Sequence, residues 1–268
     1  MKPKKPSVET SWNAVATWYD DLLKPENDTY HAKVVLPNLL RVLAPAGKRV
    51  VDIACGQGFF SEAALAAGAT DVLGVDIAPD LIGFARERIG ARSGGKARFE
   101  VASAHNISSV ATAAAFDAAM IVLALQNIKE MPETIAEAAR VLVPGGSLII
   151  VLNHPAFRIP QASSWGFDEA AGVQYRRVDH YGKSFSTKMD MNPGETSPKE
   201  KKYTVSFHRP LQEYFKALSK AGFSVTGLEE WNSHKESEPG PRAKAENEAR
   251  AEFPLFLTIV AHLSTSAN

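Results

Sequence analysis

The sequence predicts an α/β fold built on a doubly wound, mostly parallel sheet. Short apolar strands alternate with helical segments from residue 49 to 152, which is typical of a parallel sheet covered by helices on both faces. A Gly-x-Gly turn, Gly56 to Gly58, joins the first strand to a helix. The same alternation returns near the end of the chain. With 268 residues, the chain suits one large domain with an insertion.

Seven strands are expected in order along the chain. Alternating or continuous apolar residues predict strands over 49–54, 71–76, 97–102, 117–123 and 147–152. Helical spacing predicts helices over 60–68, 79–90 and 132–142. After a polar, aromatic-rich stretch, "PLQEYFKALSKAG" predicts a helix, and "FSVTGLEE" and "LFLTIVAHL" predict the last two strands. The order of elements therefore favours one continuous sheet.

The chain is interpreted as a single domain, 1–268, with four parts. Residues 1–45 would form an N-terminal helical lid, and 46–152 the cofactor-binding half. Residues 153–209 are too long for a simple connection, so they are expected to be an inserted segment that covers the substrate. Residues 210–268 supply the C-terminal helix and strands.

The amino-acid composition limits which binding partners and which cellular compartment we expect for the protein. The 30 basic and 30 acidic side chains cancel, which disfavours nucleic acid and anionic membranes as partners. The basic N-terminus is not followed by an apolar run, and no stretch reaches the roughly 20 apolar residues of a membrane span. With one cysteine, Cys55, no internal disulfide can form. We expect a cytoplasmic monomer or homodimer without a metal site.

The glycine turn in "VVDIACGQG" suits a ligand without phosphates. Dinucleotide sites want G-x-G-x-x-G, but Ser61 occupies the third glycine position, and the lysine of a phosphate loop is missing. Asp52 precedes the turn and Asp76 ends the next strand. An acid at the end of the second strand can accept both ribose hydroxyls, and a nearby acid suits an ammonium group. S-adenosylmethionine has a ribose, an amino group and a cationic sulfonium.

At this point the chain resembles the class I S-adenosylmethionine-dependent methyltransferases. "VVDIACGQG" is similar to the first motif of that family, "GVDIAPDLIGFAR" to the second and "VASAH" to the adenine-contacting motif. "FDAAMIVLALQNIKEM" and "EAARVLVPGGSLIIV" resemble the fourth and fifth. The resemblance implies a seven-stranded Rossmann-like sheet whose last strand is antiparallel. "WYD" and "LQNI" add a looser similarity to ubiquinone and menaquinone biosynthesis methyltransferases.

The resemblance implies a set of cofactor-binding residues at the ends of the strands. They are Asp52, Ala54, Gly56, Gly58, Asp76, Ile77, Ser103, Ala104, Leu123 and Gln126. Two positions depart from the family pattern. Ala54 stands where the first glycine is usual, and Ser103 stands where many relatives have an acid facing the adenine amine.

Catalytic and substrate-binding candidates come from the strand ends and the insertion. His154 follows the fifth strand, where side chains face the ligand crevice, and histidine removes protons near neutral pH. His180 and Tyr181, in "QYRRVDHY", are the next candidates for a general base. An anionic acceptor would need no base. The candidate substrate-binding residues are Trp18, Tyr19, Trp165, Tyr175 and Arg177.

The predicted function is methyl transfer from S-adenosylmethionine to an oxygen or nitrogen of a small molecule. Three alternatives remain open: an RNA or tRNA methyltransferase, a dinucleotide oxidoreductase, and a non-catalytic protein that binds S-adenosylmethionine. "NHPAF" resembles the Asn-Pro-Pro-aromatic motif of nucleic-acid methyltransferases, but it follows the fifth strand instead of the fourth. The balanced charge disfavours a nucleic-acid methyltransferase. The pattern of the last strand disfavours a dinucleotide oxidoreductase.

Overall fold

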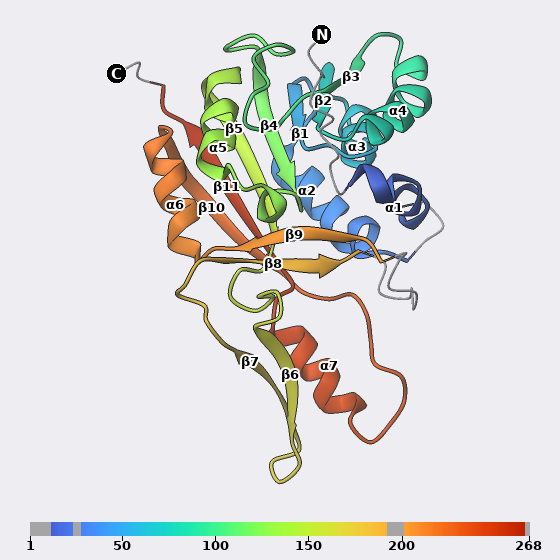
Figure 1. The fold of residues 1–268 in the computed structure, drawn as a ribbon, viewed down its shortest axis with the longest axis vertical. Coiled ribbons are helices and arrows are strands. Elements are labelled where there is room, and N and C mark those ends of the chain that lie inside the picture. Colours follow the sequence, from blue (N-terminus) through green and yellow to red (C-terminus); the bar gives the residue numbers. More distant parts are fainter. Residues whose placement is uncertain (1–11, 24–27, 192–200, 266–268) are drawn as a thin grey trace, which may run out of the picture.

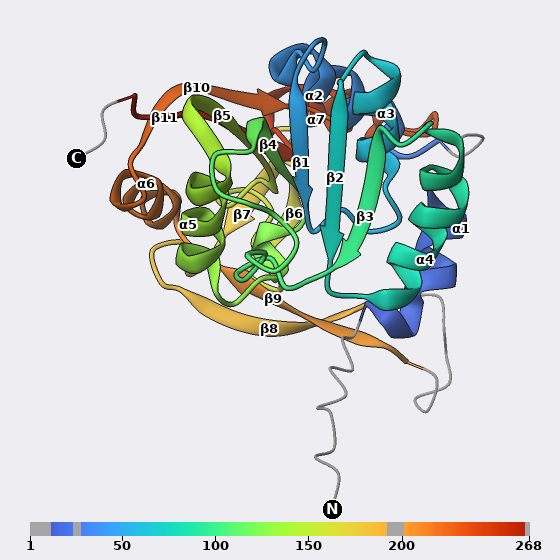
Figure 2. The same ribbon diagram turned by 90° about the horizontal axis from the view of Figure 1, so that it is seen from above.

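A computed structural model of the protein describes residues 12–23, 28–191 and 201–265. Its centre is a seven-stranded sheet in the order β10-β11-β5-β4-β1-β2-β3 (Figures 1 and 2). Strand β11 runs antiparallel to both of its neighbours, and the other neighbouring pairs are parallel. The predicted doubly wound fold class, with its antiparallel last strand, is confirmed.

The strands and helices lie close to where the sequence places them. The expected strand and helix bounds from 49 to 142 agree with the structure to within two residues, and β5 begins earlier than expected, at Leu142. The sheet strands are β1 (Arg49–Ile53), β2 (Asp71–Asp76), β3 (Ala97–Val101), β4 (Phe116–Val122), β5 (Leu142–Asn153), β10 (Phe223–Trp231) and β11 (Phe256–Leu263). The α-helices are α1 (Ala16–Leu22), α2 (Leu36–Leu43), α3 (Phe59–Ala66), α4 (Pro79–Arg88), α5 (Met131–Val141), α6 (Leu211–Lys220) and α7 (Ala243–Glu252). Short 3-10 turns are η1 (Asn13–Val15), η3 (Gly90–Arg92) and η4 (Leu125–Asn127), and a π-helical turn, η2 (His31–Val35), leads into α2.

Apolar side chains from successive strand positions bury both faces of the sheet. Val50 of β1 and Val72 of β2 are paired in register and join the cluster under α2, α3 and α4. Their neighbours Val51 and Leu73 join the opposite cluster, under α5 and α6. Since side chains alternate across a strand, an uninterrupted apolar run such as "VVDI" needs helices on both sides. The helices on the two faces of the sheet hold the strand ends in place.

The inserted segment consists of two β-hairpins. One is formed by β6 (Ser163–Asp168) and β7 (Val173–Val178), and the other by β8 (Phe185–Asp190) and β9 (Tyr203–His208). Hairpin β8–β9 crosses the edge of the sheet where the parallel strands end, as both views show (Figures 1 and 2). Hairpin β6–β7 extends away from the sheet beside α7 (Figure 1). The loop expected at "NPGETSPKEKK" lies mostly outside the described residues.

The N-terminal helix is attached to the sheet through α4. Arg88 of α4 donates one hydrogen bond to Asp20 of α1 and another to the carbonyl of Gln57 in the glycine turn, each 2.7 Å long. One side chain thus ties α1 to the turn that it covers. Part of the predicted lid, 1–11 and 24–27, lies outside the described residues. In the part of the chain that the structure describes, no helix has both the length and the apolar character needed to span a membrane.

Candidate functional site

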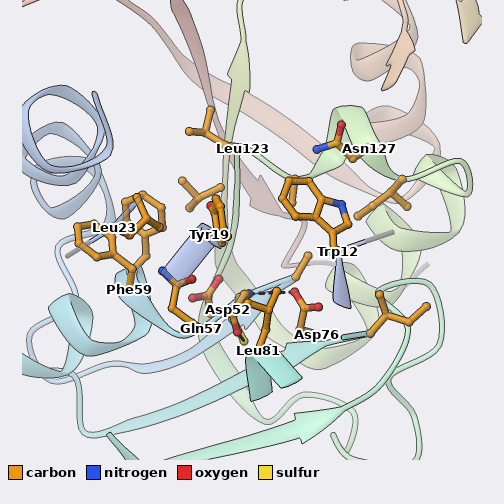
Figure 3. Close-up of a pocket in the computed structure, with 18 residues that line it drawn as sticks. Trp12, Tyr19, Leu23, Asp52, Gln57, Phe59, Asp76, Leu81, Leu123 and Asn127 are labelled. Atoms are coloured by element: carbon orange, nitrogen blue, oxygen red, sulfur yellow. Dashed lines mark hydrogen bonds between the residues drawn. The ribbon is translucent and has the colours of Figure 1, made fainter. Parts of the chain in front are cut away.

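A cavity opens at the carboxyl ends of β1, β2 and β4, underneath α1 (Figure 3). We call it the cofactor cavity. Among the described residues, its walls hold two carboxyl groups, Asp52 and Asp76, and no Lys, Arg or His side chain. The remaining lining is largely apolar or aromatic. Such a site favours an uncharged or cationic ligand over a phosphate.

The glycine turn forms the floor of this cavity. Ala54, Gly56 and Gly58 all have positive φ angles, of 62°, 57° and 85°. Ala54 thus adopts a conformation that favours glycine, which agrees with the family preference for glycine there. Gly58 begins α3, and a Cβ on it would lie 2.7 Å from Ile89 Cδ1. Gly58 is therefore needed for packing behind the turn, while Ala54 and Gly56 line the cavity.

Asp76 is fixed at the end of β2 by the backbone. Its Oδ2 accepts a 2.9 Å hydrogen bond from the Gly56 N–H, and its Oδ1 accepts one of 2.8 Å from the Ala78 N–H. Burial raises the pKa of Asp76, and these backbone hydrogen bonds oppose that rise. Each carboxylate oxygen has a second acceptor position. Asp76 can therefore accept two more hydrogen bonds from a ligand in the cavity.

Asp52 is the more deeply buried acid, with 1% of its surface exposed. Its Oδ2 accepts a 2.6 Å hydrogen bond from the Ser61 hydroxyl. Burial raises the pKa of Asp52 to about 7, the hydrogen bond from Ser61 opposes this, and the charge of Asp76 adds to it. Ser61, which replaces the third glycine of the dinucleotide pattern, therefore orients an acid of the cavity.

Aromatic side chains from the N-terminal segment cover the two acids. Trp12 and Tyr19 line the cavity and pack edge to face, with ring centroids 5.4 Å apart. Burial raises the pKa of the Tyr19 hydroxyl, and the charges of Asp76 and Asp52 raise it further. A Cβ on Gly56 would lie 3.5 Å from Tyr19 Cε1. Aromatic faces of this kind attract cations.

A second cavity adjoins the first and contains the predicted adenine contacts. It shares Ala54 and Ile77 with the cofactor cavity and is also lined by Ser103 and Ala104. The Ser103 hydroxyl is 2.9 Å from His105 Nδ1. The structure thus gathers eight of the predicted cofactor residues around the two cavities: Asp52, Ala54, Gly56, Asp76, Ile77, Ser103, Ala104 and Leu123. Gly58 and Gln126 do not line either cavity.

Beyond Tyr19 and Asn127, the cofactor cavity continues into a wider cleft between the N-terminal segment, the end of β5 and hairpin β8–β9, with Ser163 and Arg176 of hairpin β6–β7 also in its wall. We call it the lateral cleft. Gln126 lies in its wall, donating a 2.6 Å hydrogen bond from Nε2 to the Leu123 carbonyl, and its buried Oε1 has no partner among the residues that the structure describes. Trp18 lies in the same cleft and is 43% exposed. The predicted substrate residues Trp18 and Tyr19 therefore share one cleft.

Two residues of the lateral cleft were missed by the sequence analysis. Arg158 follows β5 in the loop "NHPAFRIP", and its Nη1 donates a 2.7 Å hydrogen bond to Asn153 Oδ1. His31 lies on the opposite segment, in the π-helical turn before α2. Burial and the charge of Arg158 lower the pKa of His31 to about 4. A basic residue in the loop after a parallel strand was the available signal for Arg158, whereas His31 gave none.

His154 does not lie at either cavity, contrary to our prediction. Its Nε2 is 2.7 Å from Glu230 Oε1, and its Nδ1 accepts hydrogen bonds from the N–H groups of Ala156 and Phe157. Because Nδ1 accepts, Nε2 carries the proton and donates it to Glu230. Burial lowers the pKa of His154. Both ring nitrogens are therefore occupied in holding the loop, and the ring faces away from the ligand space.

The other predicted residues of the insertion also lie away from the lateral cleft. Tyr181 accepts a 3.1 Å hydrogen bond from the Leu211 N–H, at the start of α6, and His180 lies beside it in an exposed loop. Trp165 and Tyr175 are on the projecting hairpin, and Arg177 pairs with Asp179 at 2.8 Å in solvent. None of the five lines the cofactor cavity or the lateral cleft. Hairpin β8–β9, which carries none of these candidates, covers the site instead.

Comparisons with known proteins agree with this geometry. The model of a methyltransferase domain family matches residues 50–146. The ubiquinone biosynthesis O-methyltransferase of Aromatoleum aromaticum is 37% identical over 113 residues, covering 42% of this chain and 47% of that protein. The demethylmenaquinone methyltransferase of Clavibacter sepedonicus is 33% identical over 152 residues, covering 55% and 58%. The chain spans about half the length of the curated relatives it matches.

Solved structures share the fold over most of the chain. An S-adenosylmethionine dependent methyltransferase from Mesorhizobium loti has a TM-score of 0.63 at 23% identity, covering 88% of this chain and 98% of that one. A similar protein from Listeria monocytogenes has a TM-score of 0.63 at 24% identity, covering 85% and 97%. At these identities the likeness concerns the fold. Together, the comparisons confirm the predicted resemblance to S-adenosylmethionine-dependent methyltransferases for the domain at 50–146.

Proposed function

We propose that this chain, whose residues 50–146 are a methyltransferase domain, transfers a methyl group from S-adenosylmethionine to a small molecule. One observation carries the proposal: two buried acids, Asp52 and Asp76, face a largely apolar cavity to which the described residues contribute no basic side chain. A nucleotide with phosphates would find no cation among the described residues there. A ligand with a ribose and positive charge can use both acids.

The side chains of this cavity serve binding and alignment. Asp76, held by two backbone N–H groups, would accept the ribose hydroxyls, and Asp52 would lie near the positive charge of the cofactor. When bound, S-adenosylmethionine supplies an activated methyl group whose carbon is attacked opposite the sulfur. The acceptor forms the new bond as the carbon–sulfur electrons return to sulfur. Alignment and exclusion of water by Trp12 and Tyr19 are then the main tasks of the protein.

We propose His31 as the residue that accepts the acceptor's proton, in place of His154. His31 lines the lateral cleft, and among the described residues neither of its ring nitrogens has a hydrogen-bond partner. Its lowered pKa keeps the ring neutral at physiological pH, so that it can accept a hydrogen bond from a hydroxyl or amine. A proton would pass from the acceptor to the ring as the methyl group arrives.

Oxygen is the acceptor atom that the comparisons favour. Several relatives are named ubiquinone biosynthesis O-methyltransferases, at 32–37% identity over part of their length. The aromatic side chains in the lateral cleft, Trp12, Tyr19, Tyr30 and Phe256, support a small molecule over a nucleic acid. The equal numbers of acidic and basic residues support the same choice.

Calorimetry with three ligands tests the proposed function. We expect binding of S-adenosylmethionine and S-adenosylhomocysteine, and no binding of NADH. A radiolabelled methyl-transfer screen against small metabolites and RNA fractions would then show the acceptor class. Binding of NADH without binding of either methyl-donor compound would refute the proposal. Salt-dependent methylation of RNA would favour the nucleic-acid alternative.

A further inference from the structure

We propose that the methyl acceptor carries a carboxylate group and that Arg158 in the lateral cleft binds it. The inference rests on the proposed function, because it names the substrate class of the same site. It starts from a guanidinium group on the acceptor side of the cofactor cavity that has no carboxylate partner among the described residues. No sequence motif pointed to this residue.

The position of Arg158 is fixed by its own segment and by the end of β5. Its backbone N–H donates a 2.8 Å hydrogen bond to the His154 carbonyl, and its Nη1 donates to Asn153 Oδ1. The guanidinium carbon lies 5.3 Å from the ring centroid of Phe256. Among the described residues, no carboxylate pairs with it, and the remaining N–H groups have no acceptor. A preorganised guanidinium with free donors suits bidentate binding of a carboxylate.

A second guanidinium strengthens the positive charge of the same cleft. Arg176 of β7 donates to the Phe157 carbonyl at 2.7 Å and to the Ser163 hydroxyl at 2.8 Å, and it also has no carboxylate partner within the described chain. It lies on the cleft wall together with Arg158. Burial lowers the pKa of Arg158, and the charge of Arg176 lowers it further. Within the described part of the chain, this positive charge therefore has no paired carboxylate.

The acids near the cleft are already used elsewhere. Asp190 lies 2.9 Å from Lys201 Nζ, and Asp28 lies 2.9 Å from His234 Nε2. Cations buried without a counter-ion are costly, and a bound anion would offset that cost. The cleft wall near Arg158 also includes Tyr30 and Phe256, which pack edge to face with ring centroids 5.9 Å apart. Positive charge beside two aromatic rings favours an aromatic or otherwise flat acid over a fully polar one.

A carboxylate on Arg158 would also activate His31. The charge of Arg158 is one cause of the low pKa of His31, so neutralising that charge raises the affinity of the ring for a proton. Binding of the correct acceptor would thus prepare the base that receives its proton. A neutral acceptor of the same shape would leave the pKa of His31 low.

Matched acids and amides test the proposal directly. The probes are 2-, 3- and 4-hydroxybenzoate and the corresponding hydroxybenzamides, titrated with and without S-adenosylhomocysteine. In the wild-type protein we expect at least one acid to bind about tenfold or more tightly than its amide. Arg158→Gln should abolish this preference, and Arg158→Lys should keep part of it, because the charge remains while the two-pronged geometry is lost. The matched control is Arg177→Gln, at an exposed position outside the cleft.

Two further readouts separate binding from mere loss of structure. Binding of S-adenosylhomocysteine to each variant is measured first: its absence in the wild-type protein refutes the proposed function, while the acid and amide titrations still test the carboxylate site. The pKa of His31, followed by NMR, should rise when the acid binds to the wild-type protein and should not respond in Arg158→Gln. Equal affinities for acids and amides across the panel, or an undiminished preference in Arg158→Gln, would overturn the proposal. Stronger binding of phenyl phosphate than of every benzoate would overturn it as well.

Discussion

Asp76 is the residue on which the cofactor assignment depends most directly. We expect Asp76→Ala to weaken S-adenosylhomocysteine binding by about 1.5–3 kcal/mol, because charged hydrogen bonds to the ribose would be lost. Calorimetry measures the effect. Since Asp76 also holds the Gly56 N–H, Asp76→Asn serves as a milder variant that keeps an acceptor in place. Asp71→Ala, at the opposite end of β2 beside Arg98, is the control, and an affinity loss equal to that of Asp76→Ala would contradict the ribose role.

Asp52 should make cofactor binding depend on pH. Burial raises its pKa to about 7, so the group is mostly neutral below that pH and mostly ionised above it. A cationic ligand favours the ionised form, and binding therefore releases protons near neutral pH. We expect S-adenosylmethionine affinity to increase about tenfold between about pH 6 and about pH 8. Calorimetry over this range should show that affinity rises with pH in the wild-type protein and much less in Asp52→Asn. If affinity rose equally with pH in both proteins, Asp52 would be excluded as the source of the pH dependence.

His31 is expected to affect turnover more than binding. Removal of a general base typically reduces the rate by about 100-fold or more, and we expect His31→Ala to lower kcat by about that factor. Cofactor affinity should change little, because His31 lines the lateral cleft and not the cofactor cavity. The assay is methyl transfer to an acceptor found in the screen. His154→Ala is a useful contrast: it should reduce stability through loss of the Glu230 contact, and a turnover defect without unfolding would restore His154 as a candidate.

The position of His154 outside the cavities has a simple geometric origin. Successive strand residues point to opposite sides, so a histidine one position after the last residue of β5 points away from the side on which Asn153 faces the cleft. The sequence locates the end of β5 to within one residue. Predicting which way a side chain points also requires knowing which alternate positions of the strand face the cleft. Arg158 reaches the cleft from a loop, where no periodicity exists. By contrast, Asp52 and Asp76 were predictable because a glycine turn and a strand end fix them.

At the scale of elements, the attachment of α1 to α4 can be tested through Arg88. Its guanidinium joins Asp20 to the Gln57 carbonyl, and its side chain is one-third exposed. We expect Arg88→Ala to destabilise the protein by about 1–2 kcal/mol and to speed cofactor dissociation several-fold, because the cover over the glycine turn loosens. Denaturant unfolding and stopped-flow displacement measure the two effects. Arg86→Ala, on the same helix but bonded to the Phe99 carbonyl and Glu100, should leave dissociation unchanged.

Predictability differed between the two halves of the chain for a physical reason. From β1 to β5, strands β1, β2 and β4 are each followed by an α-helix before the next strand, so local periodicity determines both the element and its neighbour. In the insertion, β6–β7 and β8–β9 are mostly exposed hairpins with polar alternation, and their placement depends on contacts with distant segments. Lys202, for example, donates to the Ala14 carbonyl across the site. Such contacts leave no pattern in the local sequence.

At the scale of the whole molecule, the ligand site joins parts that are far apart in the chain. The cofactor cavity is lined by the N-terminal segment and by the ends of β1, β2 and β4, and the lateral cleft adds β5 and hairpin β8–β9. A ligand that contacts all of these stabilises only the folded arrangement. Ligand binding should therefore appear as a shift in the global unfolding transition.

Thermal unfolding with S-adenosylhomocysteine measures this coupling. At a concentration of about 100 times Kd, a ligand specific for the folded state adds about 2.7 kcal/mol, which for a chain of this size corresponds to a rise in Tm of roughly 5–10 °C. Asp76→Asn should reduce the rise at the same ligand concentration, because its Kd is higher. NADH should give no rise, since the described part of the cavity wall offers no cation for its phosphates. An equal rise with both ligands would mean that the two acids do not select the cofactor, and the assignment of this cavity to S-adenosylmethionine would have to be abandoned.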